Sequence, residues 1–129
     1  MADAVEVIVD WERFAQARAQ LGANLVRVVG YFRDDGKKSV DAIEVALKTR
    51  NAIQIIGPAD LLKTDAMQIG ALTVAELAED IEFGARDCVE WHQAPDSLIA
   101  PVLQLRSIFE ESLAQLEREV NPLAVRRAG

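Results

Sequence analysis

The sequence predicts an all-α protein, an antiparallel up-down-up-down four-helix bundle with a short additional helix at the N-terminal end. Apolar residues recur at spacings of three and four along most of the chain, as on the buried face of a helix. No segment shows the sustained apolar-polar alternation of a half-buried strand. Half of the residues are hydrophobic but only 5% are aromatic, which favours a helical core over a sheet.

Two helices are expected in the N-terminal part of the chain. The first runs over about Trp11–Leu21, with Asp10 as its N-cap and Gly22 just beyond its end. The second runs over about 25–48. Gly36 lies inside it and predicts a bend or local fraying, because a helical glycine is roughly 1 kcal/mol less favourable than alanine.

A third helix is expected over about Ala52–Ile69, with Asn51 as its N-cap and Gly70 at its end. Pro58 lies inside this helix and predicts a kink, because proline removes one hydrogen bond and crowds the carbonyl four residues earlier. One apolar stripe follows the helix and consists of Ile55, Ala59, Leu62, Ala66 and Ile69.

Two further helices are expected in the C-terminal part. The fourth runs over about 74–91, because Thr73 and Glu76 form a capping-box pattern before it. The fifth runs over about 98–120 or 101–120 and stops before a proline. Short connections make consecutive long helices antiparallel neighbours, which predicts the up-down-up-down arrangement.

A chain of 129 residues has the size of one domain, which we assign to residues 1–129 with a core over about 10–121. A net charge of −7 disfavours binding to nucleic acid or to an anionic membrane. The single cysteine, Cys88, excludes an internal disulfide and is expected to be buried. The sequence has no recognisable signal peptide or membrane-spanning run, so a cytoplasmic location is expected.

The third helix carries the candidate functional residues. Asp60, Lys63, Thr64 and Met67 fall on a face that the apolar stripe leaves free, and Gln68 lies beside them. A carboxylate and an ammonium three residues apart on one helix face are close enough to interact. Their sequence context makes this face the candidate site.

The run that begins at Asp60 resembles the signature of histidine-containing phosphotransfer (HPt) domains, roughly His-x-x-Lys-Gly followed after a few residues by Gly-Ala. Lys63 and the pair Gly70-Ala71 match this signature. Thr64 stands where the family usually has glycine. Asp60 stands where the family has its phosphate-accepting histidine.

The resemblance covers most of the chain, and its spacing needs no gap over 46–71. It implies a helical bundle and a role in phosphorelay signalling. HPt domains carry phosphoryl groups between receiver domains of response regulators, and sometimes from histidine kinases, without being enzymes or needing a cofactor. If the roles of the family's residues are applied to this chain, Lys63 keeps an electrostatic role toward phosphate. Thr64, Met67 and Gln68 then belong with it to the docking face.

Asp60 cannot supply an imidazole nitrogen. The sequence therefore predicts an HPt-like protein that docks on a receiver domain or a histidine kinase without carrying phosphate, its carboxylate imitating the charge of a phosphohistidine. An engineered His-to-Asp variant of an active carrier is the alternative within the family. The sequence leaves both interpretations open.

Phosphorylation of Asp60 itself would give an acyl phosphate, a reaction that usually needs a divalent metal held by further carboxylates. Asp65 lies five residues on, roughly 140° around the helix, and points elsewhere. No second carboxylate of this helix shares the face of Asp60. We therefore expect neither a metal site nor self-contained aspartyl chemistry.

Outside this pattern, Asp60 and Lys63 would be an ordinary surface ion pair. A structural or oligomeric helical protein is the alternative from another class, and a large apolar patch on the first or second helix would favour it. An enzyme is not expected, because the sequence has no glycine-rich phosphate loop and no plausible catalytic triad. His92, the sole histidine, is not expected to accept phosphate, because Glu90 and Asp96 flank it.

Overall fold

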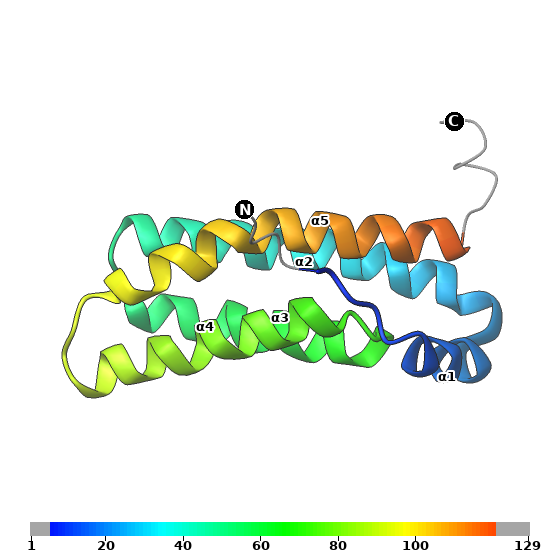
Figure 1. Cartoon of the computed structure of the whole chain (residues 1–129), viewed down its shortest axis with the longest axis horizontal. Coiled ribbons are helices and arrows are strands. Elements are labelled where there is room, and N and C mark those ends of the chain that lie inside the picture. The colour runs from blue at the N-terminus through cyan, green and yellow to red at the C-terminus, as the bar shows by residue number, and fades with distance from the viewer. Residues whose placement is uncertain (1–5, 121–129) are drawn as a thin grey trace.

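Four long helices lie side by side and enclose the apolar core (Figure 1). The structure is a computed structural model that describes residues 6–120, and within them it contains helices and no strand. The predicted all-helical fold class is confirmed. Pro122, expected to stop the last helix, lies outside the described residues. The elements are α1 (Trp11–Leu21), η1 (Gly22–Asn24), α2 (Leu25–Lys48), α3 (Ala52–Ile69), α4 (Leu72–Glu90), η2 (Pro95–Leu98) and α5 (Ile99–Val120).

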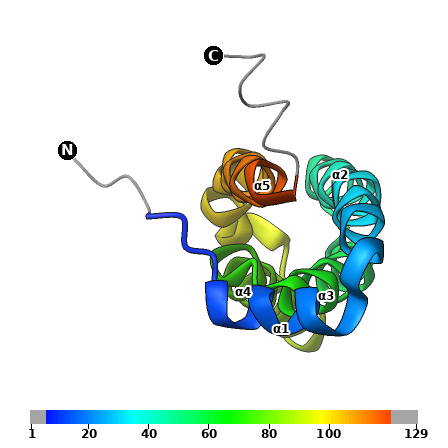
Figure 2. The ribbon, with the colours of Figure 1, turned by 90° about the vertical axis from the view of Figure 1, so that its right-hand side faces the viewer.

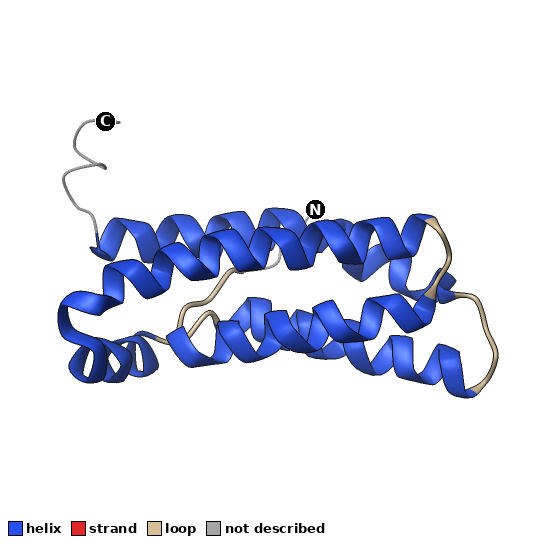
Figure 3. Cartoon of the chain, turned by 180° about the vertical axis from the view of Figure 1, so that it is seen from behind, coloured by secondary structure: helices blue, strands red, loops and turns tan. Residues whose placement is uncertain are grey.

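The long helices form a ring. α3 has its most extensive contacts with α4 and α2, and α5 closes the ring by packing against both α2 and α4. In Figure 1, α2 and α5 make one layer, and α3 and α4 make the other. Figure 2 shows α1 lying across one end of the bundle, where it contacts α3. The connections between the helices are short (Figure 3).

Local caps determine where α1 and α3 begin and where α3 ends, as the sequence predicts. Asp10 Oδ1 accepts a hydrogen bond from the Arg13 amide at 3.1 Å, and Asn51 Oδ1 accepts one from the Gln54 amide at 3.2 Å. Gly70 ends α3 in the left-handed conformation, with φ 84°. Its carbonyl accepts a hydrogen bond from the Asp10 amide at 2.7 Å, so the end of α3 and the start of α1 are joined.

The predicted capping box at the start of α4 is wrong. The helix begins at Leu72, directly after the Gly70 turn, and no side chain caps it. The Thr73 hydroxyl instead accepts a hydrogen bond from the Ile8 amide at 2.7 Å, and the Thr73 amide donates to the Ile8 carbonyl at 3.3 Å. Thr73 therefore ties the segment before α1 to the first turn of α4.

The fraying predicted near Gly36 does not occur, because α2 is one continuous helix. Gly36 is buried, and a Cβ atom at this position would collide with the ring of Phe109 on α5. The glycine therefore lets an aromatic ring approach the backbone of α2 closely. α3 is likewise continuous through Pro58, whose kink stays a prediction.

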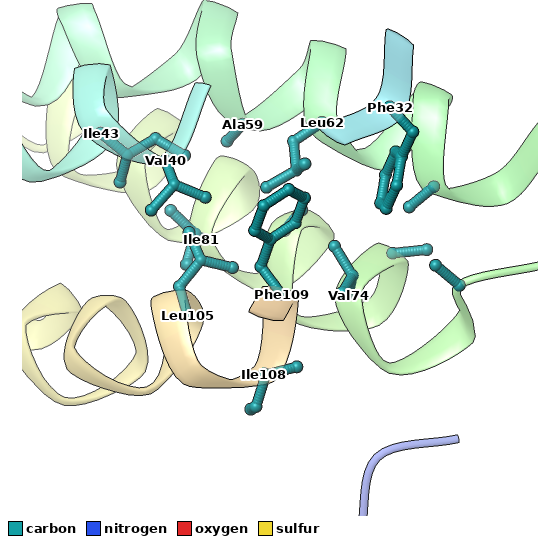
Figure 4. Packing of buried hydrophobic residues seen from close by; sticks show 14 of the residues in the cluster. Phe32, Val40, Ile43, Ala59, Leu62, Val74, Ile81, Leu105, Ile108 and Phe109 are labelled. Carbon is teal, nitrogen blue, oxygen red and sulfur yellow. The ribbon is translucent and has the colours of Figure 1, made fainter. Parts of the chain in front are cut away.

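The core lies between the two layers and contains the whole predicted stripe of α3, each member of which is at most 1% exposed. The Phe109 ring packs against Phe32 of α2, with the ring centroids 5.3 Å apart. Cys88 is buried as predicted. Among the helices of the described chain, none combines the length and apolar composition needed to cross a bilayer. Figure 4 shows the rings of Phe32 and Phe109 beside Leu62, together with Val40, Ile43, Val74, Ile81 and Leu105.

The contact between Gly36 and Phe109 predicts an unusual response to alanine. Gly36→Ala is expected to destabilise the protein by about 1–3 kcal/mol, because the added methyl group overpacks the core. Gly30→Ala is the matched control on the same helix. Its new Cβ would meet only the end of the Arg33 side chain at 3.7 Å, so helix propensity should stabilise the protein by about 0.5–1 kcal/mol. Urea unfolding measures both, and equal effects would contradict the packing.

Candidate functional site

The free face of α3 presents Asp60, Lys63, Thr64 and Met67 around the middle of the helix, whereas Gln68 borders a cavity toward α2 together with Asp65. Asp60, Thr64, Met67 and Gln68 are exposed. Lys63 is half-buried, because its side chain lies between α3 and α4 with 18% of its surface exposed. The packing of the apolar stripe against α2 and α4 determines this orientation.

Lys63 is shared between two carboxylates. Its Nζ lies 2.7 Å from Glu82 Oε1 and 3.4 Å from Asp60 Oδ1. The Glu82 side chain is only 4% exposed, whereas that of Asp60 is 52% exposed. The Nζ also lies 5.4 Å from the centre of the Phe83 ring, within range of a cation-π contact. Lys63 is therefore held more closely by the buried carboxylate than by its neighbour on α3.

Glu82 has a second cationic partner on its own helix. Arg86 donates to Glu82 Oε2 through Nε at 3.0 Å and through Nη2 at 2.8 Å. Burial disfavours the charged carboxylate, but the hydrogen bonds from Lys63 and Arg86 outweigh it and lower the pKa of Glu82. The hydrogen bond to Glu82 likewise raises the pKa of Lys63. The negative charges of Asp60 and Glu82 and the positive charges of Lys63 and Arg86 therefore cancel at neutral pH.

The sequence pattern of α3 does not predict Glu82, because this carboxylate lies on the neighbouring helix and not on the helix that carries Asp60. One signal could have indicated it. Glu82 directly follows Ile81 of the α4 apolar stripe and stands four residues before Arg86, the spacing of a helical ion pair. A carboxylate at the border of a stripe is a candidate partner for a cation of the adjacent helix.

The other polar residues near Asp60 have different roles. Thr64 Oγ1 donates to the Asp60 carbonyl at 3.0 Å, so its hydroxyl is engaged within α3. Asp65 faces α2, where burial and the nearby charge of Asp35 raise its pKa. It does not join Asp60, as the helical geometry predicts. Within residues 6–120, no group of three or more candidate ligands could hold a metal ion.

Apolar side chains surround the charged centre. Leu61 and Met67 of α3 are 52% and 57% exposed, and Phe83 of α4 is 50% exposed. A groove of about 290 Å³ runs between α2 and α3 beside Leu61. It is lined by Asp35, Lys38, Ser39, Ala42, Gly57, Pro58 and Leu61. The arrangement offers a partner both exposed apolar contacts and one accessible carboxylate.

His92 lies apart from this face. It follows the C-terminal end of α4 with φ 53° and borders a cavity beside the connection between α2 and α3. Its backbone geometry and exposure are those of a turn residue after a helix end. The buried sulfur of Cys88 lies 3.7 Å from the Ala94 carbonyl oxygen in the same region. Neither residue contacts the Asp60 site.

No model of a known protein family, no curated protein sequence and no solved structure matches this chain. The α3 face is therefore assigned from its residues, their geometry and the sequence pattern that they form.

The buried ion pair predicts how stability depends on pH. The folded-state pKa of Glu82 lies below its usual value of 4.5, so the stabilisation is present above that value and is lost as the pH falls through the folded-state pKa. Glu82→Gln is expected to lower stability at neutral pH and to flatten this acid dependence. Urea unfolding between about pH 7 and about pH 3 measures both effects.

Glu79→Gln is the control for this measurement, because it makes the same chemical change at an exposed position of α4. It should leave the acid dependence unchanged. A Glu82→Gln profile that runs parallel to the wild-type profile would contradict a charged, paired Glu82.

Proposed function

We propose that this protein is an HPt-like signalling module that docks on a receiver domain of a response regulator or on a histidine kinase. The docking face is the exposed side of α3 around Asp60. The observation that carries the proposal is the position of Asp60: an exposed carboxylate in the middle of a bundle helix, with Lys63 three residues on, where the HPt signature has its histidine.

The proposed framework is an antiparallel up-down-up-down four-helix bundle with α1 as an accessory helix. The alternating helix directions visible in Figure 1 support it, as do the short connections of Figure 3. The contact of α1 with α3 and the hydrogen bond between Asp10 and Gly70 support a fixed position for the accessory helix. A long, regular helix such as α3 suits a docking role, because it holds its exposed residues in fixed relative positions.

In this proposal the protein does not carry phosphate. A carboxylate oxygen in place of an imidazole nitrogen would form an acyl phosphate, which usually needs a metal-assisted site. Asp65 faces α2 and is not available for such a site. Asp60 then acts as a permanent negative charge on the docking face. The protein would be a cytoplasmic, non-enzymatic partner without a cofactor of its own.

The apolar residues around Asp60 provide the contact area. Leu61 and Met67 are more than half exposed, and the groove beside Leu61 offers a recess for a partner side chain. Thr64 presents its methyl group, because its hydroxyl is bonded to the helix backbone. Central apolar contacts with a polar rim are the usual composition of protein interfaces.

One observation favours docking over the structural or oligomeric alternative. The strongly exposed apolar residues of α2 are Val26, Tyr31 and Val45, and they are spread along the helix rather than joined in one stripe. Single exposed apolar residues are normal on protein surfaces. The large patch that would indicate an oligomerisation face on α2 is not formed by these three. The engineered His-to-Asp alternative concerns the origin of Asp60 and uses the same docking face.

Substitution on the docking face should weaken partner binding. Met67→Asp and Leu61→Asp are each expected to raise the dissociation constant for a receiver domain at least about tenfold, because each places a charge in the centre of the interface. Leu103→Asp is the matched control, since Leu103 is 75% exposed on α5 and lies outside the face. Calorimetric titration against receiver domains measures binding. Equal losses for all three variants would argue against this face.

The lack of phosphate carriage is tested directly with a phosphorylated receiver domain. The wild-type protein is expected to stay unlabelled when it is incubated with a receiver that carries radioactive phosphate, because Asp60 offers no imidazole. Treatment with alkali distinguishes the two possible products, because a phosphohistidine survives alkali whereas an acyl phosphate is hydrolysed. Label on the wild-type chain would refute this part of the proposal.

A further inference from the structure

The carboxylate of Glu82 is coordinated as a bound anion would be. One oxygen accepts from Lys63 at 2.7 Å, and the other accepts two hydrogen bonds from Arg86 at 3.0 and 2.8 Å. Within residues 6–120, Glu82 is the one charged residue that is buried. A carboxylate with three charge-assisted donors, nearly closed off from solvent, occupies a complete oxyanion site.

Carboxylate and phosphoryl oxygens compete for the same donors, because both are strong acceptors for Lys and Arg. Lys63 is the cation at the candidate site, and its Nζ lies closer to Glu82 than to Asp60. A phosphoryl group near position 60 would have to displace Glu82 from Lys63. The charge of Lys63 is therefore already compensated from inside the protein.

We propose that Glu82 is an internal anion that occupies the phosphate-binding groups of this site. The inference rests on the proposed HPt-like function and adds a second determinant to it. Two features then prevent phosphate carriage. Position 60 has a carboxylate in place of an imidazole, and Lys63 and Arg86 already donate their hydrogen bonds to Glu82. Removal of the Glu82 charge leaves two cations without their shared carboxylate, and one of them, Lys63, lies next to position 60. This creates a site for a phosphoryl group or inorganic phosphate.

The competing explanation is that Glu82 only fastens α3 to α4. A purely structural role predicts that loss of the charge lowers stability and adds no affinity for phosphate. Anion occupancy predicts a gain of phosphate binding that appears only when the Glu82 charge is removed. The two explanations therefore differ in the sign of the effect on phosphate.

The test uses the full chain in three variants: Asp60→His, Asp60→His with Glu82→Gln, and Asp60→His with Glu79→Gln as the matched control. Each is treated with phosphoramidate, so no partner protein is needed. The introduced imidazole nitrogen attacks phosphorus, the phosphorus-nitrogen bond of phosphoramidate breaks, and ammonia leaves and takes up the imidazole proton. Phosphorus NMR follows the phosphohistidine formed and its hydrolysis.

The variant that lacks the Glu82 charge is expected to form phosphohistidine about tenfold faster, or to keep it about tenfold longer, than the other two, since Lys63 becomes free to donate to the phosphoryl oxygens. Equal formation and equal lifetime in all three variants would overturn the proposal. If none of the three variants forms phosphohistidine, the proposal is overturned as well, because release of Lys63 from Glu82 would then not suffice to create a phosphate site.

A second readout reports on Lys63 without any covalent step. In nitrogen-15 NMR, the Lys63 ammonium signal of the Asp60→His protein should not respond to inorganic phosphate, whereas in the variant that also carries Glu82→Gln it should shift with saturation. If the glutamine variant does not fold, Glu82→Met replaces it, since methionine has a similar length and no charge. No phosphate response in a folded variant lacking the Glu82 charge would contradict anion occupancy.

The outcomes separate this inference from the proposed docking function. Docking is measured with the wild-type protein and a receiver domain, and anion occupancy is measured without a partner. If the protein binds a receiver domain but removal of the Glu82 charge does not change phosphate binding, the docking proposal stands and the anion-occupancy proposal fails. If removal of the charge changes phosphate binding but no receiver domain binds, anion occupancy stands and the docking proposal fails.

Discussion

The rotation of α3 about its own axis is the constraint on which the rest of the molecule depends. Five apolar residues, from Ile55 to Ile69, fix this rotation, because each is at most 1% exposed and the helix packs against both α2 and α4. Successive helical residues are about 100° apart, so a shift by one position would bury a charged residue and expose the stripe. The exposure of Asp60 and the inward direction of Lys63 therefore follow from hydrophobic packing rather than from any contact made by the charged residues themselves.

The ion pairs between α3 and α4 have a different role from the stripe. Burial of Glu82 is unfavourable by itself, and the hydrogen bonds from Lys63 and Arg86 offset that penalty. Buried ion pairs of this kind contribute little net stability, but they restrict the register in which two helices can pack, because a displaced carboxylate would lose its partners. The same contacts that select one packing of α3 on α4 also set the charge of the Asp60 face.

The features that the sequence predicts correctly are local. The caps at Asp10, Asn51 and Gly70 involve atoms within a few residues, and the apolar stripe of α3 follows from the period of one helix. The errors and omissions are contacts over long distances in the chain. Thr73 pairs with a residue 65 positions away, and Lys63 pairs with a residue 19 positions away. Helix periodicity orients each element against the core but does not specify which side chains of neighbouring helices meet.

The segment before α1 follows the flank formed by α4 and α5. Val7 accepts a hydrogen bond from Gln115 of α5 at 3.2 Å, and the Ile8 backbone pairs with Thr73 of α4. A fluorescent reporter or purification handle attached at this end would therefore leave the bundle from the α4 and α5 side. Surface immobilisation through such a handle keeps the groove between α2 and α3 accessible, whereas coupling through surface lysines would modify Lys38 in its lining.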